Sequence, residues 1–215
     1  MKAKIIFTVI SSLLFFWACS NKQKTDNQSA VKSSNDTAII VKSENSVTQD
    51  QQKYFGIECG YVKYSTYTAG QELIREWWFD DYGNKQYEKN YLIINGEKSG
   101  DKTLIKDGIQ YKWSLDATSG TKIKHYQTKT DYNQISQKDI DRYGIKKHGF
   151  EEFIGKNCLK VSTEKPKSTS WVWENIVLKS ETEIAGQKVI MKATEINDNK
   201  PEASLFEMPA DVTFE

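Results

Sequence analysis

From Gln51 to the C-terminus, apolar and polar side chains alternate along the chain. In residues 109–115 every odd position is apolar and every even position is polar, and residues 189–194 alternate similarly. A period of two is typical of a β-strand with one face in water. Turn signals separate such runs at residues 81–84, 95–96, 107–108, 119–120, 155–156 and 185–186. The pattern predicts about ten or eleven strands joined by hairpins, in an antiparallel meander.

One short helix is predicted within this strand-rich region. Ser136 is a favourable N-cap, Asp139 stands where a capping box places its acid, and Gly144 supplies a stop. A single helix between two groups of strands is expected to lie across the open side of a curved sheet. There it would bury Ile140 and Tyr143.

The N-terminal 50 residues have a different pattern. Lys2 and Lys4 precede an apolar run over residues 5–18, which is too short to span a bilayer core of roughly 30 Å. The run ends at Cys19 and resembles a bacterial lipoprotein signal peptide, in which cleavage before the cysteine is followed by acylation of its thiol. We therefore predict a signal peptide over residues 1–18 and lipidation of Cys19. A plain secretory signal followed by an incidental cysteine is the alternative.

The residues after Cys19 are predicted to form a tether. Residues 20–50 contain no Phe, Trp, Tyr, Gly or Pro and are dominated by small polar and charged side chains. Such a stretch cannot bury enough apolar surface to offset the entropy lost on ordering, so we expect disorder. The predicted organisation is thus a lipidated cysteine and tether over residues 19–50, followed by a β domain over residues 51–215.

Charge and arginine content exclude one class of partner. The chain has 30 basic and 29 acidic residues, a formal net charge of +1, and its two arginines are Arg75 and Arg142. A nearly neutral chain provides no field to gather nucleic acid, and arginine is the side chain that reads phosphate and guanine in bidentate fashion. We expect no nucleic-acid partner.

The sequence offers little material for catalysis or metal binding. His125 and His148 are the two histidines, and neither has a second histidine or a cysteine pair at ligand spacing. No serine elbow or phosphate loop is recognisable. We therefore expect a protein that is not an enzyme, with no metal and no cofactor.

Two further cysteines, Cys59 and Cys158, lie in the predicted β domain. In an oxidising envelope they could pair, and closing so long a loop stabilises a fold by about 3–5 kcal/mol in the chain-entropy model. Each could equally be a small buried hydrophobic residue.

The aromatic content of the β domain is the remaining candidate for function. Its large rings either fill the core or line a cavity for an apolar ligand, to which each buried methylene would contribute about 0.8 kcal/mol. Period two indicates which rings share a face but not which face is inward. The candidates for lining a cavity are Trp77, Trp78, Phe79, Tyr111, Trp113, Trp171 and Trp173.

A series of short motifs in this region resembles a known group of proteins. The series comprises residues 60–64, 78–83, 155–158, 171–173 with 178–179, and 206–210. In this order it resembles small Bacteroidetes lipoproteins of unknown function, which look related to the LolA/LolB-like lipoprotein-carrier superfamily. The resemblance covers about residues 54–215. It implies an incomplete antiparallel β-barrel of about eleven strands, short helices over its mouth and a hydrophobic cavity.

The combined expectation is a membrane-anchored envelope lipoprotein whose β domain binds a lipid or acyl chain, in lipid or lipoprotein transport. The alternative is a non-catalytic interaction lipoprotein that docks an envelope protein through its outer surface or a sheet edge. Ser20 and Asn21 follow the cysteine in place of an aspartate, which by analogy favours the outer membrane. The face of that membrane and the oligomeric state are left open.

Overall fold

The computed structural model describes residues 52–68 and 70–215. The predicted signal peptide, Cys19 and the predicted tether lie outside the described residues. Contacts between residues divide the chain into Met1–Gln49 and Asp50–Glu215, and every element below belongs to the second unit.

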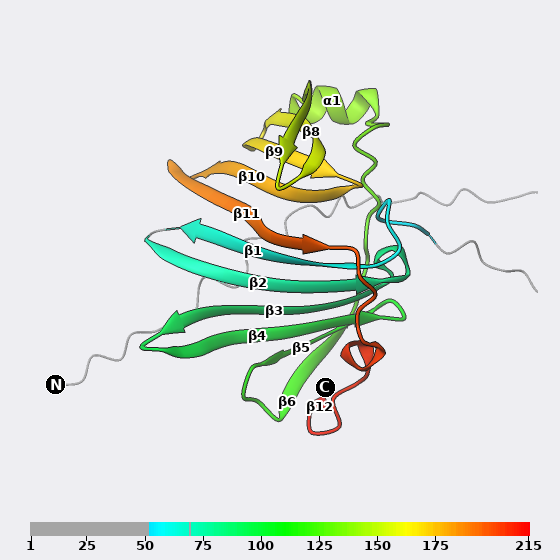
Figure 1. Cartoon of the computed structure of the whole chain (residues 1–215), viewed down its shortest axis with the longest axis vertical. Helices are drawn as coiled ribbons and strands as arrows, with labels where there is room; N and C mark the ends of the chain where they lie inside the picture. The colour runs from blue at the N-terminus through cyan, green and yellow to red at the C-terminus, as the bar shows by residue number, and fades with distance from the viewer. Residues whose placement is uncertain (1–51, 69) are drawn as a thin grey trace, which may run out of the picture. The chain divides into compact units, whose positions relative to one another are not determined.

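Twelve strands form one sheet in the order β12-β6-β5-β4-β3-β2-β1-β11-β10-β9-β8-β7 (Figure 1). Neighbouring strands are antiparallel, except that β12 runs parallel to β6. The strands are β1 Gly60–Thr68, β2 Gln71–Asp80, β3 Lys85–Ile94, β4 Glu97–Lys106, β5 Ile109–Ser114, β6 Ser119–Lys124, β7 Lys146–Phe153, β8 Lys156–Glu164, β9 Lys167–Trp173, β10 Ile176–Ile184, β11 Gln187–Asn197 and β12 Thr213–Phe214. The helical segments are α1 Gln137–Tyr143 and two short 3-10 turns, η1 Asp81–Gly83 and η2 Ala203–Phe206.

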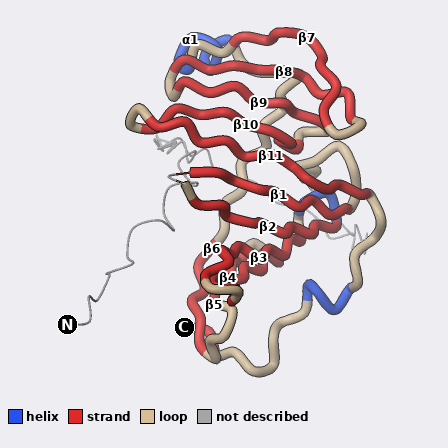
Figure 2. The backbone as a smooth tube through the Cα atoms, turned by 60° about the vertical axis from the view of Figure 1, so that its left-hand side comes forward, coloured by secondary structure: helices blue, strands red, loops and turns tan. Residues whose placement is uncertain are grey.

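The sheet is open, because its two terminal strands, β12 and β7, do not pair with each other. It twists along its length, so that β8 and β9 run at a steep angle to β3 and β4 (Figures 1 and 2). The pairing of β1 with β11 joins the first six strands to the last five meander strands. The predicted fold class, a mainly β protein with an incomplete antiparallel barrel, is confirmed.

Local turn chemistry explains why the meander forms. Asn95-Gly96, Asp107-Gly108 and Ala185-Gly186 each have two consecutive residues with positive φ, as a two-residue type I′ hairpin turn requires. The predicted turn at Ser119-Gly120 was wrong, because β6 begins at Ser119 and the preceding connection is Leu115–Thr118.

Side chains of the two sheet faces form separate hydrophobic clusters. The first-face cluster contains Val62, Tyr64, Trp77 and Phe79 and continues through buried residues of β8–β11. The second-face cluster contains Tyr87, Leu104, Trp113 and Phe206. Trp78 pairs with Tyr87, and Tyr87 pairs with Leu104, so these side chains point to the face opposite Trp77.

The helix begins and ends as predicted, but its position differs from the prediction. The Ser136 hydroxyl accepts a hydrogen bond from the Asp139 amide at 3.2 Å, and Gly144 ends the helix with φ 63°. However, no residue of α1 is fully buried. The Tyr143 carbonyl accepts from the Lys165 amide at 3.2 Å, which places α1 beside the β8–β9 turn instead of across the sheet.

Other side chains occupy the place expected for the helix. Phe55 and Ile57, which precede β1, pack against the first-face cluster, as do Phe153 at the end of β7 and Ile154 of the β7–β8 turn. Ile140 and Tyr143 are only half-buried. The first-face cluster is therefore covered by short apolar segments and not by a helix.

Candidate functional site

The C-terminal segment, residues 198–215, lies across the second face of the sheet (Figure 1). At its middle, Phe206 of η2 is buried in the second-face cluster, and its carbonyl accepts from Lys106 Nζ at 3.1 Å. At its end, β12 pairs with β6, where the Thr213 amide donates to the Thr118 carbonyl at 2.9 Å. The segment is thus fixed at two points, and residues 207–212 run between them.

Aromatic packing strengthens the second attachment. The Phe214 ring lies edge-on to Tyr111 and Trp113, with ring centroids 5.1 Å and 5.6 Å away. The backbone of Glu215 donates to Gly120 and accepts from Lys122. Although β12 has two residues, it is held by side-chain contacts as well as by the ladder.

A pocket of about 340 Å³ lies between this segment and the sheet; we refer to it as the C-terminal pocket. Strands β3 and β5 supply Tyr87 and Trp113, which are buried. The other apolar lining residues come from the β5–β6 connection and from the C-terminal segment: Leu115, Ala117, Leu205, Met208, Pro209 and Val212.

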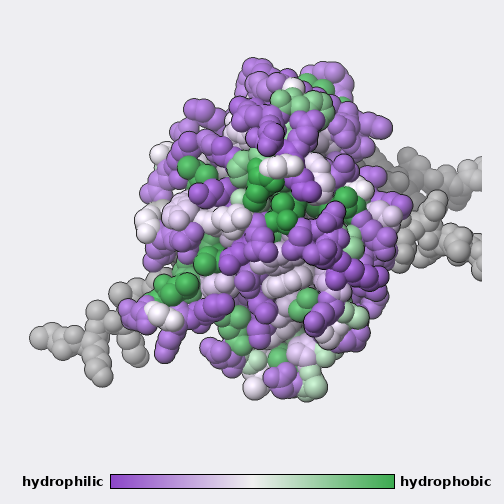
Figure 3. All heavy atoms as spheres, viewed as in Figure 1, coloured by the Kyte–Doolittle hydropathy of each residue, from purple (hydrophilic) through white to green (hydrophobic). Residues whose placement is uncertain are grey.

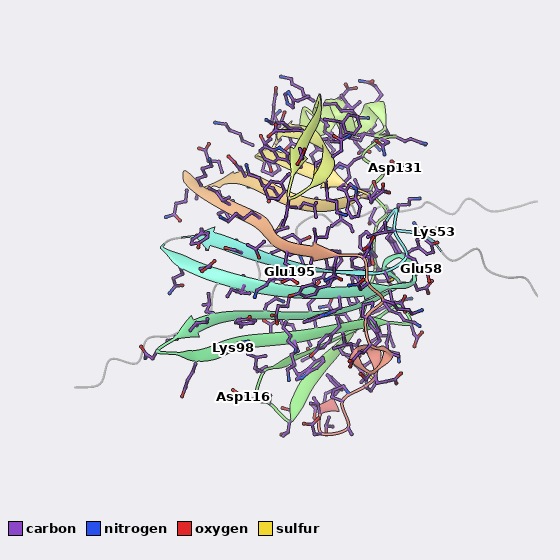
Figure 4. All side chains as sticks on the ribbon, in the orientation of Figure 1. Lys53, Glu58, Lys98, Asp116, Asp131 and Glu195 are labelled. Carbon is purple, nitrogen blue, oxygen red and sulfur yellow. The ribbon has the colours of Figure 1, made fainter. Side chains whose placement is uncertain are left out.

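Polar side chains also line the C-terminal pocket, and most of them are exposed. Asp116 lies at the β5–β6 turn (Figure 4), and Glu207 and Asp211 come from the C-terminal segment. Lys102 of β4 is half-buried, and its Nζ donates to the Leu115 carbonyl at 3.4 Å. The site therefore combines a buried aromatic wall with carboxylates at its solvent side.

The buried tyrosine of the pocket is held in its neutral form. Burial, and to a lesser degree the Glu76 carboxylate, raise the pKa of Tyr87. At neutral pH its hydroxyl therefore contributes no charge to the pocket.

The seven aromatic residues proposed from the sequence separate into two groups and do not share one cavity. Trp77, Phe79, Trp171 and Trp173 belong to the first-face cluster. Trp77 and Phe79 have centroids 5.0 Å apart, and both contact the Phe55 ring. These rings fill a core.

The remaining three candidates, Trp78, Tyr111 and Trp113, belong to the second-face cluster. Of these, Trp113 lines the C-terminal pocket, whereas Trp78 and Tyr111 pack against the second-face cluster and do not line the pocket. Tyr87 and the lining residues after Asn197 were not among the sequence candidates. The sequence did carry a signal that the C-terminal segment packs against the sheet, because apolar residues recur along it: Leu205, Phe206, Met208, Val212 and Phe214.

The first face carries a charged pair that the sequence did not single out as a site. Arg75 Nη2 lies 2.5 Å from Glu88 Oε1, with 29% and 8% of the two side chains exposed. The guanidinium carbon lies 5.4 Å from the ring centroid of Tyr64 and 5.0 Å from that of Trp77. The pair lies on the face opposite the C-terminal pocket.

Cys59 and Cys158 are both free thiols. Cys158 is completely buried in the first-face cluster, and Cys59 is half-buried with its Sγ 3.8 Å from the Asp198 carbonyl. In the structure they therefore do not form the disulfide that the sequence left open.

Two further findings concern the described part of the chain. No group of three or more His, Cys, Asp or Glu side chains is placed there to hold a metal ion. Among its helices, none has the length and apolar character needed to cross a membrane.

No protein-family model matches the sequence, and no curated protein matches it either. Solved structures do share the fold. An uncharacterised conserved protein from Thermus thermophilus matches with a TM-score of 0.50 and 10% identity, over 74% of this chain and 90% of its own. At this identity the likeness shows the fold alone.

Weaker structural matches include MucB and a LolA superfamily protein. MucB, in the Pseudomonas aeruginosa MucA/MucB complex, matches with a TM-score of 0.47 and 14% identity, over 72% of this chain and 57% of that chain. This chain thus spans less than two thirds of MucB. The LolA superfamily protein, from Nitrosomonas europaea, matches with a TM-score of 0.33 and 11% identity, over 71% of this chain and 91% of its own.

Proposed function

We propose that this chain is a lipid-anchored protein of the cell envelope whose β domain binds an amphipathic ligand, a lipid or acyl chain, in the C-terminal pocket. The observation that carries the proposal is the pocket itself, with about 340 Å³ beside the buried rings of Tyr87 and Trp113. Small-molecule sites usually enclose about 300–1,000 Å³. A volume near the lower end of that range favours a single chain over a bulky ligand.

The pocket matches the two ends of an amphipathic molecule. The apolar end would lie against Tyr87, Trp113 and Leu205, where each methylene removed from water contributes about 0.8 kcal/mol. The polar end would lie among the exposed side chains of Asp116 and Glu207. No catalytic group is needed for such binding, and transport of a lipid or lipoprotein is the process it would serve.

The anchor belongs to the same proposal. Acylation of Cys19 would attach the protein to a membrane, favoured as the outer membrane, and residues 20–50 would connect it to the β domain. An apolar ligand of low solubility is most accessible to a protein held at a membrane.

The proposal is tested by titrating the full chain carrying Cys19→Ala with dimethyldecylphosphine oxide below its micellar concentration. Isothermal calorimetry should show saturable binding. Ala117→Trp, which places an indole into the C-terminal pocket, should abolish it. Ile93→Trp provides a control, because Ile93 is 59% exposed at the β3–β4 hairpin. Absence of binding, or equal binding by the Ala117→Trp variant, would contradict the proposal.

Docking of an envelope protein is the second candidate function. Tyr67, Ile93 and Ile94 are 48%, 59% and 43% exposed at the hairpin ends of β1 and of β3. Elsewhere on the face in Figure 3, hydrophobic residues form small groups separated by hydrophilic ones. Replacement of Ile93 and Ile94 by Ser should remove a cross-linked partner if docking is the function, whereas Ala117→Trp should leave that partner in place.

A further inference from the structure

We infer that the C-terminal pocket selects amphipathic ligands whose polar end carries a positively charged nitrogen. This inference rests on the proposed function and names the chemical class of the ligand. It is carried by the charges that surround the pocket.

Carboxylates outnumber ammonium groups at the pocket. Asp116, Glu207 and Asp211 line it, whereas Lys102 is its one basic lining residue. Across residues 52–68 and 70–215, no salt bridge involves any of the three carboxylates. None of the three therefore forms a direct ion pair, although Lys106 Nζ lies 3.1 Å from the Phe206 carbonyl beside Glu207.

The carboxylates approach the pocket from two segments that are far apart in the sequence. Asp116 lies on the β5–β6 connection, which forms part of the sheet side of the pocket. Glu207 and Asp211 lie on the stretch between η2 and β12, which forms the opposite wall. A cation at the solvent side of the pocket would thus have acidic groups on both sides.

Lys102 offsets little of the negative charge of the three carboxylates. Lys102 Nζ points to the Leu115 carbonyl, to which it donates at 3.4 Å, and the lysine itself is half-buried. An anionic polar end at the pocket would face three lining carboxylates and one lining ammonium group.

The excess of negative charge is local to the pocket. The whole chain has a formal net charge of +1, so the overall charge would not by itself attract a cation. The three carboxylates are exposed, and two unit charges 4 Å apart in water interact by only about 1 kcal/mol. We therefore expect a moderate preference that weakens as salt is added.

The test compares three probes with the same decyl chain, all below their micellar concentrations and at low salt. They are decyltrimethylammonium, dimethyldecylphosphine oxide and undecanoate, which are positive, neutral and negative. Calorimetry with the Cys19→Ala full chain should give about a five- to tenfold tighter Kd for the cation than for undecanoate, the size expected when about 1–1.4 kcal/mol separates them. The neutral probe should fall between them.

Variants assign the preference to the three side chains. The triple variant Asp116→Asn, Glu207→Gln and Asp211→Asn should bind the three probes with similar affinities. Glu97→Gln is the matched control, since Glu97 is an exposed carboxylate at the distant β3–β4 turn. It should leave the preference unchanged.

The possible results separate this inference from the proposed function. Equal affinity for the three probes, or tighter binding of undecanoate, would overturn the inference and leave the proposed function standing. A cation preference that survives in the triple variant would also overturn it. Failure of the neutral probe to bind would overturn both.

Discussion

Leu104 is completely buried on the second face, at the base of the cluster that supports the C-terminal pocket. It pairs across the sheet with Tyr87 and Tyr111. Leu104→Ala should lower the free energy of unfolding by about 2–5 kcal/mol, because it removes apolar contacts and leaves a cavity. Urea denaturation followed by tryptophan fluorescence measures the change.

Ile93→Ala is the control for this substitution. Ile93 also lies in a β-strand of the same hairpin, but 59% of its surface is exposed. Its replacement should change the free energy of unfolding by less than about 0.5 kcal/mol. Equal losses in the two variants would contradict the assignment of the second-face cluster as a core.

The Arg75–Glu88 pair provides a second test at the scale of residues. Glu88→Gln leaves the guanidinium without its carboxylate, and Arg75 is still 29% exposed. Complete burial of an unpaired charge costs about 3–5 kcal/mol, so we expect a smaller loss of about 1–3 kcal/mol. Urea denaturation provides the measurement.

The double variant Arg75→Met, Glu88→Leu should recover most of that loss, because a well-packed apolar pair often replaces a buried ion pair without penalty. If Glu88→Gln left the free energy of unfolding unchanged, or if the double variant were less stable than the single one, Arg75 and Glu88 would not stabilise the fold as a pair.

Among the elements, the C-terminal segment decides whether a pocket exists. Its last attachment depends on Phe214, which contacts Tyr111 and Trp113. Phe214→Ala should release β12 at a cost of about 1–3 kcal/mol, less than for a fully buried Phe because this residue is half-buried. Hydrogen exchange should accelerate at the amides of Thr213, Glu215 and Lys122.

Phe150→Ala is the matched control for Phe214→Ala and lies at the other end of the sheet. Phe150 lies on β7 and is 66% exposed, so its replacement should leave all these amides unchanged. Unaltered exchange in Phe214→Ala would mean that the backbone ladder alone holds the C-terminus.

Elements whose ends are determined by neighbouring residues could be predicted from the sequence. Asn95-Gly96 and Asp107-Gly108 specify their hairpin turns, and Ser136 with Gly144 specifies the ends of α1, because the determining atoms lie within a few residues. The position of α1 could not be predicted in this way. The first face is covered instead by Phe55 and Ile57, through contacts between distant parts of the chain that local sequence does not reveal.

The candidate site was predicted less well than the fold, for the same reason. Alternation placed Trp77 and Trp78 on opposite faces, as observed, but it could not show which face keeps a space. That space exists because residues 203–214 cross strands about a hundred positions earlier in the chain. Trp113 was a candidate from the sequence, whereas Tyr87 and Met208 follow only from the three-dimensional arrangement.

At the scale of the whole molecule, acylation of Cys19 should make this a membrane-bound protein. Cys19→Ala should move the chain from the membrane fraction to the soluble fraction, because the acyl chains that hold it would be lost. Cys59→Ala is the control, since Cys59 is a free, half-buried thiol of the β domain. Unchanged membrane fractionation of Cys19→Ala would contradict lipidation.

The most direct measurement of the central claim follows the methionine methyl groups during ligand binding. The chain has three methionines, and two of them, Met191 and Met208, lie in the described part of the structure. Met208 lines the C-terminal pocket, whereas Met191 packs against the first-face cluster. The methyl signals are therefore reporters for the two faces.

The full chain carrying Cys19→Ala, labelled with carbon-13 at its methionine methyl groups, would be titrated with dimethyldecylphosphine oxide. Met208→Leu assigns one signal and Met191→Leu the other. Binding in the C-terminal pocket should produce a saturable shift of the Met208 methyl signal and leave the Met191 signal unchanged. A shift confined to Met191, or no shift at either residue, would contradict binding in the C-terminal pocket.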